Sequence, residues 1–151
     1  MQHIFVGWHM KKLIIAALLI MMTQAYASQW QCEIFRINVK NDTPSTCYLI
    51  QRTINSGKVY KRQPYKIKPG TTVTQFEVVE NHHEQVSVVL TYECADNHTI
   101  TLLSSKGRCY YQNTGKIEGI ITKANNLNAV FSSKEGSYLS PQPGSILWTI
   151  S

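Results

Sequence analysis

The strongest candidate for chemistry is a basic segment at residues 55–70, which carries five cations and no acid. Two prolines stiffen the segment, so less conformational entropy is lost when it binds a partner. Two tyrosines add flat apolar rings with polar tips, which suit a membrane interface or the face of a sugar. We therefore predict an anion-binding loop with ligand-binding residues Lys58, Tyr60, Lys61, Arg62, Tyr65, Lys66 and Lys68. The alternative is a solvated loop whose cations only aid solubility.

Acidic residues gather in the part of the chain that follows. No acid occurs between Asp42 and Glu77, whereas five acids and no Lys or Arg occur from Glu77 to Asp96. This segregation predicts two surfaces of opposite charge.

Histidines occur beside acids at two places, but their spacing is a poor match to a metal site. His82 and His83 precede Glu84, and adjacent side chains in a strand point to opposite faces, so the pair can share a ligand only in a loop. His98 lies in a turn-like stretch after Asp96, and no third metal ligand is identifiable at either place. We predict no metal and no cofactor, and leave open a pH-responsive role for these histidines.

Sequence motifs of enzymes are also missing. The chain has no nucleophile elbow, P-loop, H-E-x-x-H or Gly-rich dinucleotide motif. We therefore expect a binding protein and not an enzyme.

The four cysteines, Cys32, Cys47, Cys94 and Cys109, predict two disulfides if the chain is exported. Three connectivities are possible. Proximity along the chain favours Cys32–Cys47 and Cys94–Cys109, while the absence of a C-x-x-C pair argues against a zinc site.

The first 27 residues have the pattern of a secretory signal peptide. Lys11 and Lys12 precede an apolar run at 13–22, and Ala25 and Ala27 fit a cleavage site. The run is shorter than the roughly 20 residues of a membrane-spanning helix. We expect cleavage to leave a single soluble, exported domain at 28–151, and Met10 is an alternative start. Export and a net charge of only +6 argue against nucleic acid as a partner.

Period-two alternation of apolar residues predicts an all-β fold. The clearest case is a hairpin, with strands at 85–94 and 99–103 around a turn at 95–98. Further strands are expected at 31–39, 47–54, 71–79, 108–112, 116–121, 128–133 and 145–150, separated by Gly, Pro, Asn and Ser turns. We predict a single antiparallel β-sandwich of about eight or nine short strands, stapled by disulfides, whose terminal strand pairs inside a sheet.

Residues 37–78 resemble the N-terminal part of aegerolysin-type proteins. The shared elements are Asn-x-Thr at 41–43, a Ser-Gly-Lys turn at 56–58, Pro64, the I-x-P-G of 67–70, and Phe76 in the next strand. The resemblance implies a small β-sandwich that binds membrane lipids. In overall style the chain is also similar to small proteins that intracellular bacteria export.

Together these features indicate a secreted, non-enzymatic effector that contacts anionic host lipids, phosphoinositides among them, because Lys/Arg clusters match phosphates. A glycan-binding module or adhesin is the first alternative, and a small secreted hydrolase or an enzyme inhibitor is the second. The ligand, the oligomeric state and the choice between periplasm and exterior stay open.

Overall fold

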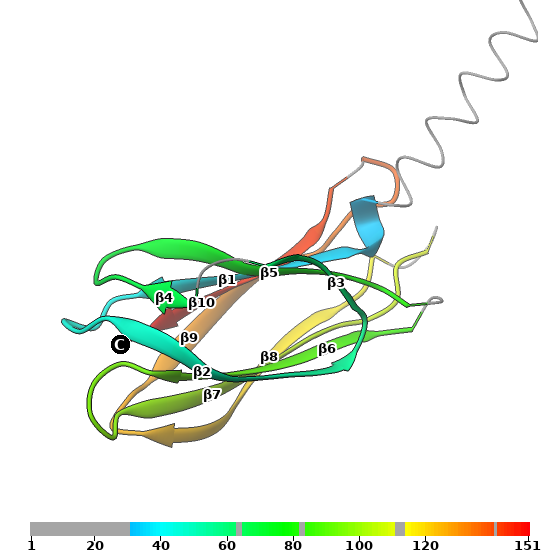
Figure 1. Cartoon of the computed structure of the whole chain (residues 1–151). Helices are drawn as coiled ribbons and strands as arrows, with labels where there is room; N and C mark the ends of the chain where they lie inside the picture. The colour runs from blue at the N-terminus through cyan, green and yellow to red at the C-terminus, as the bar shows by residue number, and fades with distance from the viewer. Residues whose placement is uncertain (1–30, 63–64, 82–83, 111–113, 141) are drawn as a thin grey trace, which may run out of the picture.

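Two packed β-sheets make up the fold in a computed structural model that describes residues 31–62, 65–81, 84–110, 114–140 and 142–151 (Figure 1). The predicted signal peptide lies outside the described residues. The strands are β1 (Ile34–Asn41), β2 (Cys47–Ser56), β3 (Lys58–Arg62), β4 (Lys66–Ile67), β5 (Thr72–Val79), β6 (Val86–Glu93), β7 (Thr99–Lys106), β8 (Ile117–Asn125), β9 (Ala129–Lys134) and β10 (Gly144–Ile150). The prediction of an all-β fold is confirmed.

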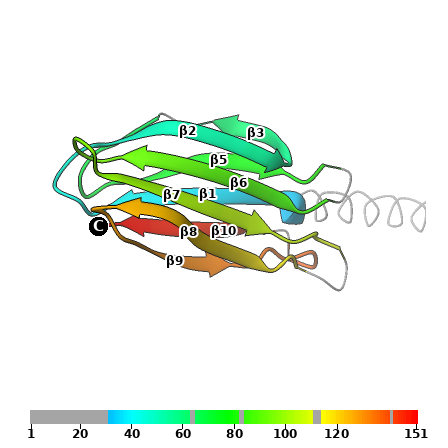
Figure 2. The ribbon, with the colours of Figure 1, turned by 90° about the horizontal axis from the view of Figure 1, so that it is seen from below.

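The two sheets each contain five of the described strands. Sheet A has the order β3-β5-β1-β10-β9 and sheet B has the order β4-β2-β6-β7-β8. Figure 2 shows β2, β6, β7 and β8 of sheet B side by side. Neighbouring strands are antiparallel except for β1 and β10, which run parallel. The terminal strand β10 therefore pairs on both sides inside sheet A, as expected.

Side chains that alternate along each strand build the core between the sheets. Along β6 and β7 the buried positions recur every second residue, and β10 buries Ile146, Trp148 and Ile150. The Trp148 indole Nε1 donates a hydrogen bond to Ser104 Oγ at 2.9 Å, so the one polar atom of this buried ring is satisfied.

The predicted hairpin forms as β6 and β7, with Val86 opposite Lys106 at one end and Glu93 opposite Thr99 at the other. Asn97 has a φ of 62°, in the left-handed region that Asn tolerates better than most residues. The local turn chemistry of residues 95–98 therefore accounts for this connection.

The cysteines do form two disulfides, but the pairing favoured by proximity along the chain is wrong. Cys47 bonds to Cys94, and Cys32 bonds to Cys109. The first bond joins β2 to the end of its antiparallel neighbour β6. The second joins the start of sheet A to the β7–β8 connection of sheet B, at the other end of the sandwich. The Cys47–Cys94 bond follows the pairing of β2 with β6, whereas the Cys32–Cys109 bond links the two sheets, so both pairs are distant in sequence.

Three other expectations need correction. The described residues form ten strands, and the segment predicted as a basic loop contributes two of them, β3 and β4. No strand forms at 108–110, where Cys109 is held by its disulfide, and 111–113 lie outside the described residues. The acids between 77 and 96 do not form one surface: Glu77 and Glu93 lie in different sheets, and Glu80 is buried.

Candidate functional site

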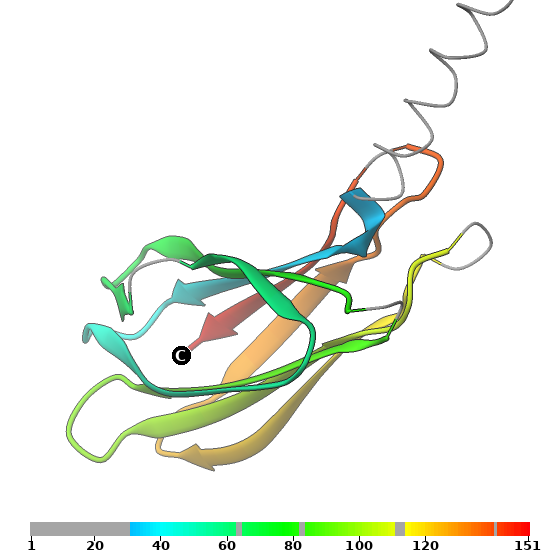
Figure 3. The ribbon, with the colours of Figure 1, turned by 45° about the vertical axis from the view of Figure 1, so that its right-hand side comes forward.

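The basic segment runs along one long side of the sandwich and changes sheets on its way. β3 pairs with β5 at the edge of sheet A, and β4 pairs with β2 at the edge of sheet B. Figure 3 shows the chain rising from β2 in the lower layer to β3 in the upper layer. Five of the seven predicted ligand-binding residues therefore lie in extended edge strands and not in one loop, while Tyr65 and Lys68 flank β4.

Three side chains gather where β4 meets the start of β2. Tyr48 lies opposite Lys66, and the Tyr48 and Tyr65 ring centroids are 6.4 Å apart at an angle of 34°. The Lys66 Nζ lies 5.8 Å from the Tyr48 ring centroid, within the range of a cation–π contact. Both tyrosines are exposed, at 41% for Tyr48 and 65% for Tyr65. We call Tyr48, Tyr65, Lys66 and the neighbouring Lys68 the tyrosine–lysine edge.

A rigid turn holds the end of this edge in place. Thr71 donates its backbone N–H to Lys68 O, and its hydroxyl donates to the same oxygen at 2.7 Å. Pro69 and Gly70 occupy the central positions, and Gly70 has a φ of 69°. This is the sequence and geometry of a type II turn, in which Pro presets the first φ and Gly supplies the second.

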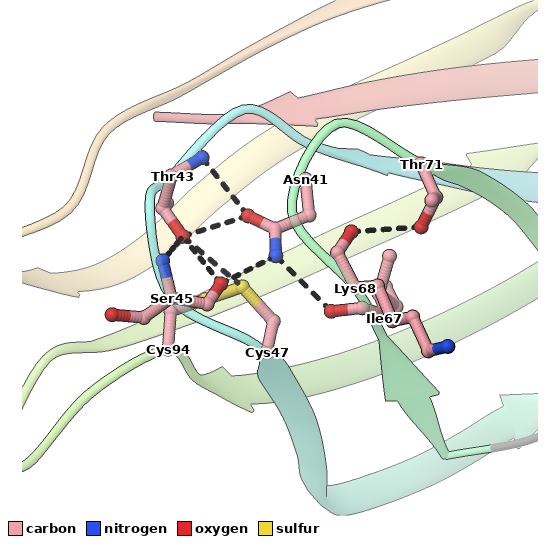
Figure 4. The surroundings of a disulfide bond; sticks show 8 residues. All are labelled: Asn41, Thr43, Ser45, Cys47, Ile67, Lys68, Thr71 and Cys94. Atoms are coloured by element: carbon pink, nitrogen blue, oxygen red, sulfur yellow. Dashed lines mark hydrogen bonds between the residues drawn. A yellow bond between two sulfur atoms is a disulfide. The ribbon is translucent and has the colours of Figure 1, made fainter.

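The buried Asn41 fastens that turn to the neighbouring connection (Figure 4). Its amide donates to the carbonyl oxygens of Ser45 at 2.7 Å and Ile67 at 3.1 Å. Its Oδ1 accepts from the backbone N–H and the hydroxyl of Thr43. The Asn-x-Thr motif of the sequence resemblance therefore ties together the chain on both sides of the Cys47–Cys94 disulfide and supports the position of Lys68.

The β3 half of the segment is arranged differently. Lys58 and Tyr60 are exposed, while Lys61 lies opposite Glu77 across the strand pair. Glu77 accepts a hydrogen bond from Arg36 Nε at 2.8 Å, so acid and base alternate across this part of sheet A. The side chain of Arg62 is not described. The predicted residues thus form two groups, of which the β4 group is the more purely cationic.

The sequence analysis did not identify Tyr48, which belongs to the tyrosine–lysine edge, or the nearby Ile50. Both belong to β2, and Ile50 is 54% exposed. Alternation offered a signal for Tyr48, because a residue next to the buried Cys47 points to the opposite face. Its contact with Tyr65 depends on the β2–β4 pairing, which no local pattern reveals.

A buried ion pair lies in another part of the molecule. The Lys106 ammonium donates to Glu80 Oε1, which also accepts the Cys109 N–H at 2.8 Å, and both side chains are almost fully buried. Burial raises the pKa of Glu80 and lowers the pKa of Lys106, although each partner opposes the other's shift. Burial also raises the pKa of Tyr92 well above its ordinary value. The side chains of all three residues are almost fully buried.

Within the described ranges no group of three or more His, Cys, Asp or Glu side chains could hold a metal ion. His82 and His83 lie outside those ranges, and His98 sits half-buried in the β6–β7 turn. No helix in the described part of the chain is long and apolar enough to cross a membrane.

The chain is similar to known proteins in its fold but not in its sequence. No protein-family model and no curated protein matches the chain. The lipid binding protein Nakanori, which is aegerolysin-like, matches with a TM-score of 0.59 at 10% identity, over 93% of this chain and 85% of its own. IP-1A from Alcaligenes faecalis has a TM-score of 0.52 at 12% identity, over 81% of this chain and 92% of its own. The RahU protein, solved in complex with a Tris molecule, has a TM-score of 0.53 at 11% identity, over 80% of this chain and 96% of its own. At such identities the likeness shows the fold alone.

Proposed function

We propose that this chain is a non-enzymatic binding protein that docks on membranes with anionic phospholipid headgroups through its tyrosine–lysine edge. The observation that carries the proposal is the exposed cluster of Tyr48, Tyr65 and Lys66. Tyrosine rings partition into the membrane interface, where the hydroxyl stays wet and the ring body is shielded. A lysine beside them then lies at the depth of the lipid phosphates.

The expected strength of this attraction follows from the charges on the edge and on the neighbouring β3. Lys58, Lys66 and Lys68 are exposed and have no acidic partner among the described residues, and each contributes about 1 kcal/mol near an anionic leaflet. Lys61 contributes less because Glu77 lies opposite it. A total of about 3 kcal/mol corresponds to a preference of roughly 150-fold for anionic over neutral vesicles at low salt.

Two further observations support the proposal. Nakanori shares the fold and is described as a lipid binding protein. Two disulfides fit a chain that folds in an oxidising compartment, so we include export, and an effector role at host membranes, in the proposal. Phosphoinositides are the favoured headgroup class, because clustered lysines match several phosphates on one ring.

Vesicle sedimentation of the disulfide-bonded protein tests the proposal. Neutral, phosphatidylserine and phosphoinositide vesicles are compared at low and physiological salt, with Lys66→Glu beside Lys123→Glu. Both variants change the net charge equally, but Lys123 is exposed on β8, on the opposite long side of the sandwich. Charge reversal at Lys66 should weaken binding to anionic vesicles by about 2 kcal/mol, or roughly 30-fold.

The matched pair makes the result decisive. Equal losses in both variants would reduce the effect to general charge attraction, which salt screens. No binding of the wild-type protein at either salt would overturn the membrane proposal. Binding that requires a phosphoinositide and fails only in Lys66→Glu would support a headgroup-reading edge.

A further inference from the structure

A row of charged side chains crosses the outer face of sheet A, away from the tyrosine–lysine edge. Strand pairing places Glu77, Arg36, Ser145 and Lys134 next to one another on β5, β1, β10 and β9. Arg36 and Ser145 point outward because their chain neighbours on both sides are buried in the core. The order of charges along the row is therefore acid, base, neutral, base.

The small residue in this row leaves a hollow between two cations. Neighbouring strands lie about 4.8 Å apart, so Arg36 and Lys134 flank Ser145 at roughly 10 Å from each other. Their long side chains can converge above the serine hydroxyl. An open polar pocket of about 450 Å³ lies at this position, lined also by Asn38, Thr74, Gln142 and Pro143.

Glu77 orients the Arg36 guanidinium toward the pocket, and its single negative charge does not neutralise the two cations there. It accepts the Nε–H of Arg36 at 2.8 Å, which fixes the plane of the guanidinium, and the Arg36 side chain stays 44% exposed. Lys134 has no acidic partner in the described part of the chain. Two cations against one acid leave the pocket with a net positive charge.

We propose that this pocket binds a phosphate group carried on a small hydroxylated molecule. The phosphate oxygens accept from the Arg36 amino groups, the Ser145 hydroxyl and the Lys134 ammonium, a donor set of the kind that gives strong charge-assisted hydrogen bonds. Thr74 donates to Asn38 Oδ1 at 2.7 Å, and Asn38 Nδ2 donates to Ile146 O at 3.4 Å. These two bonds hold the Asn38 side chain at the next position along the face and leave its second amide hydrogen for a ligand hydroxyl. The volume exceeds what phosphate alone needs, and it fits a sugar phosphate or a polyol phosphate headgroup. This inference is independent of the proposed function at the tyrosine–lysine edge.

Amide and side-chain NMR of the disulfide-bonded protein at constant ionic strength tests the site. The titrants are inorganic phosphate, glucose 6-phosphate and glucose. We expect saturable shifts at residues 36, 134 and 145 with both phosphates and none with glucose. Lys134→Gln should weaken binding about tenfold or more, whereas the matched Lys123→Gln should leave it unchanged. Ser145→Asp, which places an anion at the floor of the pocket, should abolish the shifts.

The same variants identify the source of the phosphate. If Lys134→Gln also weakens binding to phosphoinositide vesicles, the ligand is a lipid headgroup; if vesicle binding is unchanged, it is a soluble ester. Both results support the phosphate site. If Lys66→Glu loses vesicle binding but still shows the phosphate shifts, the phosphate site and the tyrosine–lysine edge act independently. Unsaturable shifts spread over many surface lysines, or wild-type affinity in Lys134→Gln, would overturn the proposal.

Discussion

Removal of one partner from the buried Lys106–Glu80 pair should strongly destabilise the protein. Lys106→Met keeps most of the aliphatic stem, which packs beside Gly144, but removes the ammonium. Glu80 then keeps only the Cys109 N–H at 2.8 Å, and its Oε2 already has no hydrogen-bond partner among the described residues. Breaking a buried pair in this way costs about 3–5 kcal/mol, which is a large part of the stability of a small domain.

A double-mutant cycle separates this cost from the net contribution of the pair. Adding Glu80→Gln removes the orphaned charge while its amide oxygen can still accept the Cys109 N–H. Because desolvation opposes the attraction in buried pairs, the double variant should lie within about 1 kcal/mol of the wild type. Urea unfolding with intact disulfides measures both quantities from the midpoint at constant slope.

The loss of stability caused by Lys106→Met should also depend on pH, and the pKa of Glu80 sets the direction. Burial raises its pKa above the ordinary value of 4.5, so its contribution to stability is fully present below pH 4.5 and is lost as the pH rises through the raised folded value. Lys106 lowers the pKa of Glu80, so this pKa should be higher in Lys106→Met. The variant therefore continues to lose stability up to a higher pH than the wild type. The cost of Lys106→Met should therefore be larger at pH 8 than at pH 5. A cost below 1 kcal/mol at pH 8, or a double variant as unstable as the single one, would refute this reasoning.

Two further predictions concern positions that the fold leaves little freedom to change. Replacing both Cys47 and Cys94 with alanine should lower the free energy of unfolding by about 2–5 kcal/mol, because the bond closes a long stretch of chain, with a sequence separation of 47 residues. Urea unfolding measures this change, and unchanged stability would show that β2–β6 pairing alone constrains this end of the sandwich. Gly119→Ala should cost about 1–3 kcal/mol, because the new Cβ would lie 2.7 Å from Trp148 Cζ2 and 2.9 Å from Phe131 Cδ1. The same urea assay checks it, with Ala124 on β8 changed to Ser as an exposed control, and a neutral result would mean that the two rings move at no cost.

Alternation in the sequence predicted which face of each strand meets the core, and it did so well in β6 and β7. The same parity places Lys106 in line with Ile100 and Leu102, so its burial could have been foreseen. Its partner could not, because Glu80 follows a strand of the other sheet. The basic segment was predicted as a loop because Pro64 and the cations of the segment mask any alternation of apolar residues. Pairing with β5 and β2 turns parts of the segment into strands β3 and β4.

The sequence by itself determined the class of the fold, the number of disulfides and the chemistry available to one segment. These depend on local pattern: period-two burial, turn residues and the count of cysteines. Only the tertiary structure decided which cysteines pair, which tyrosines meet Lys66, and that Arg36 and Lys134 flank Ser145. The reason is that neighbours in a sheet are set by how two apolar faces close on each other, and strand order there does not follow order along the chain.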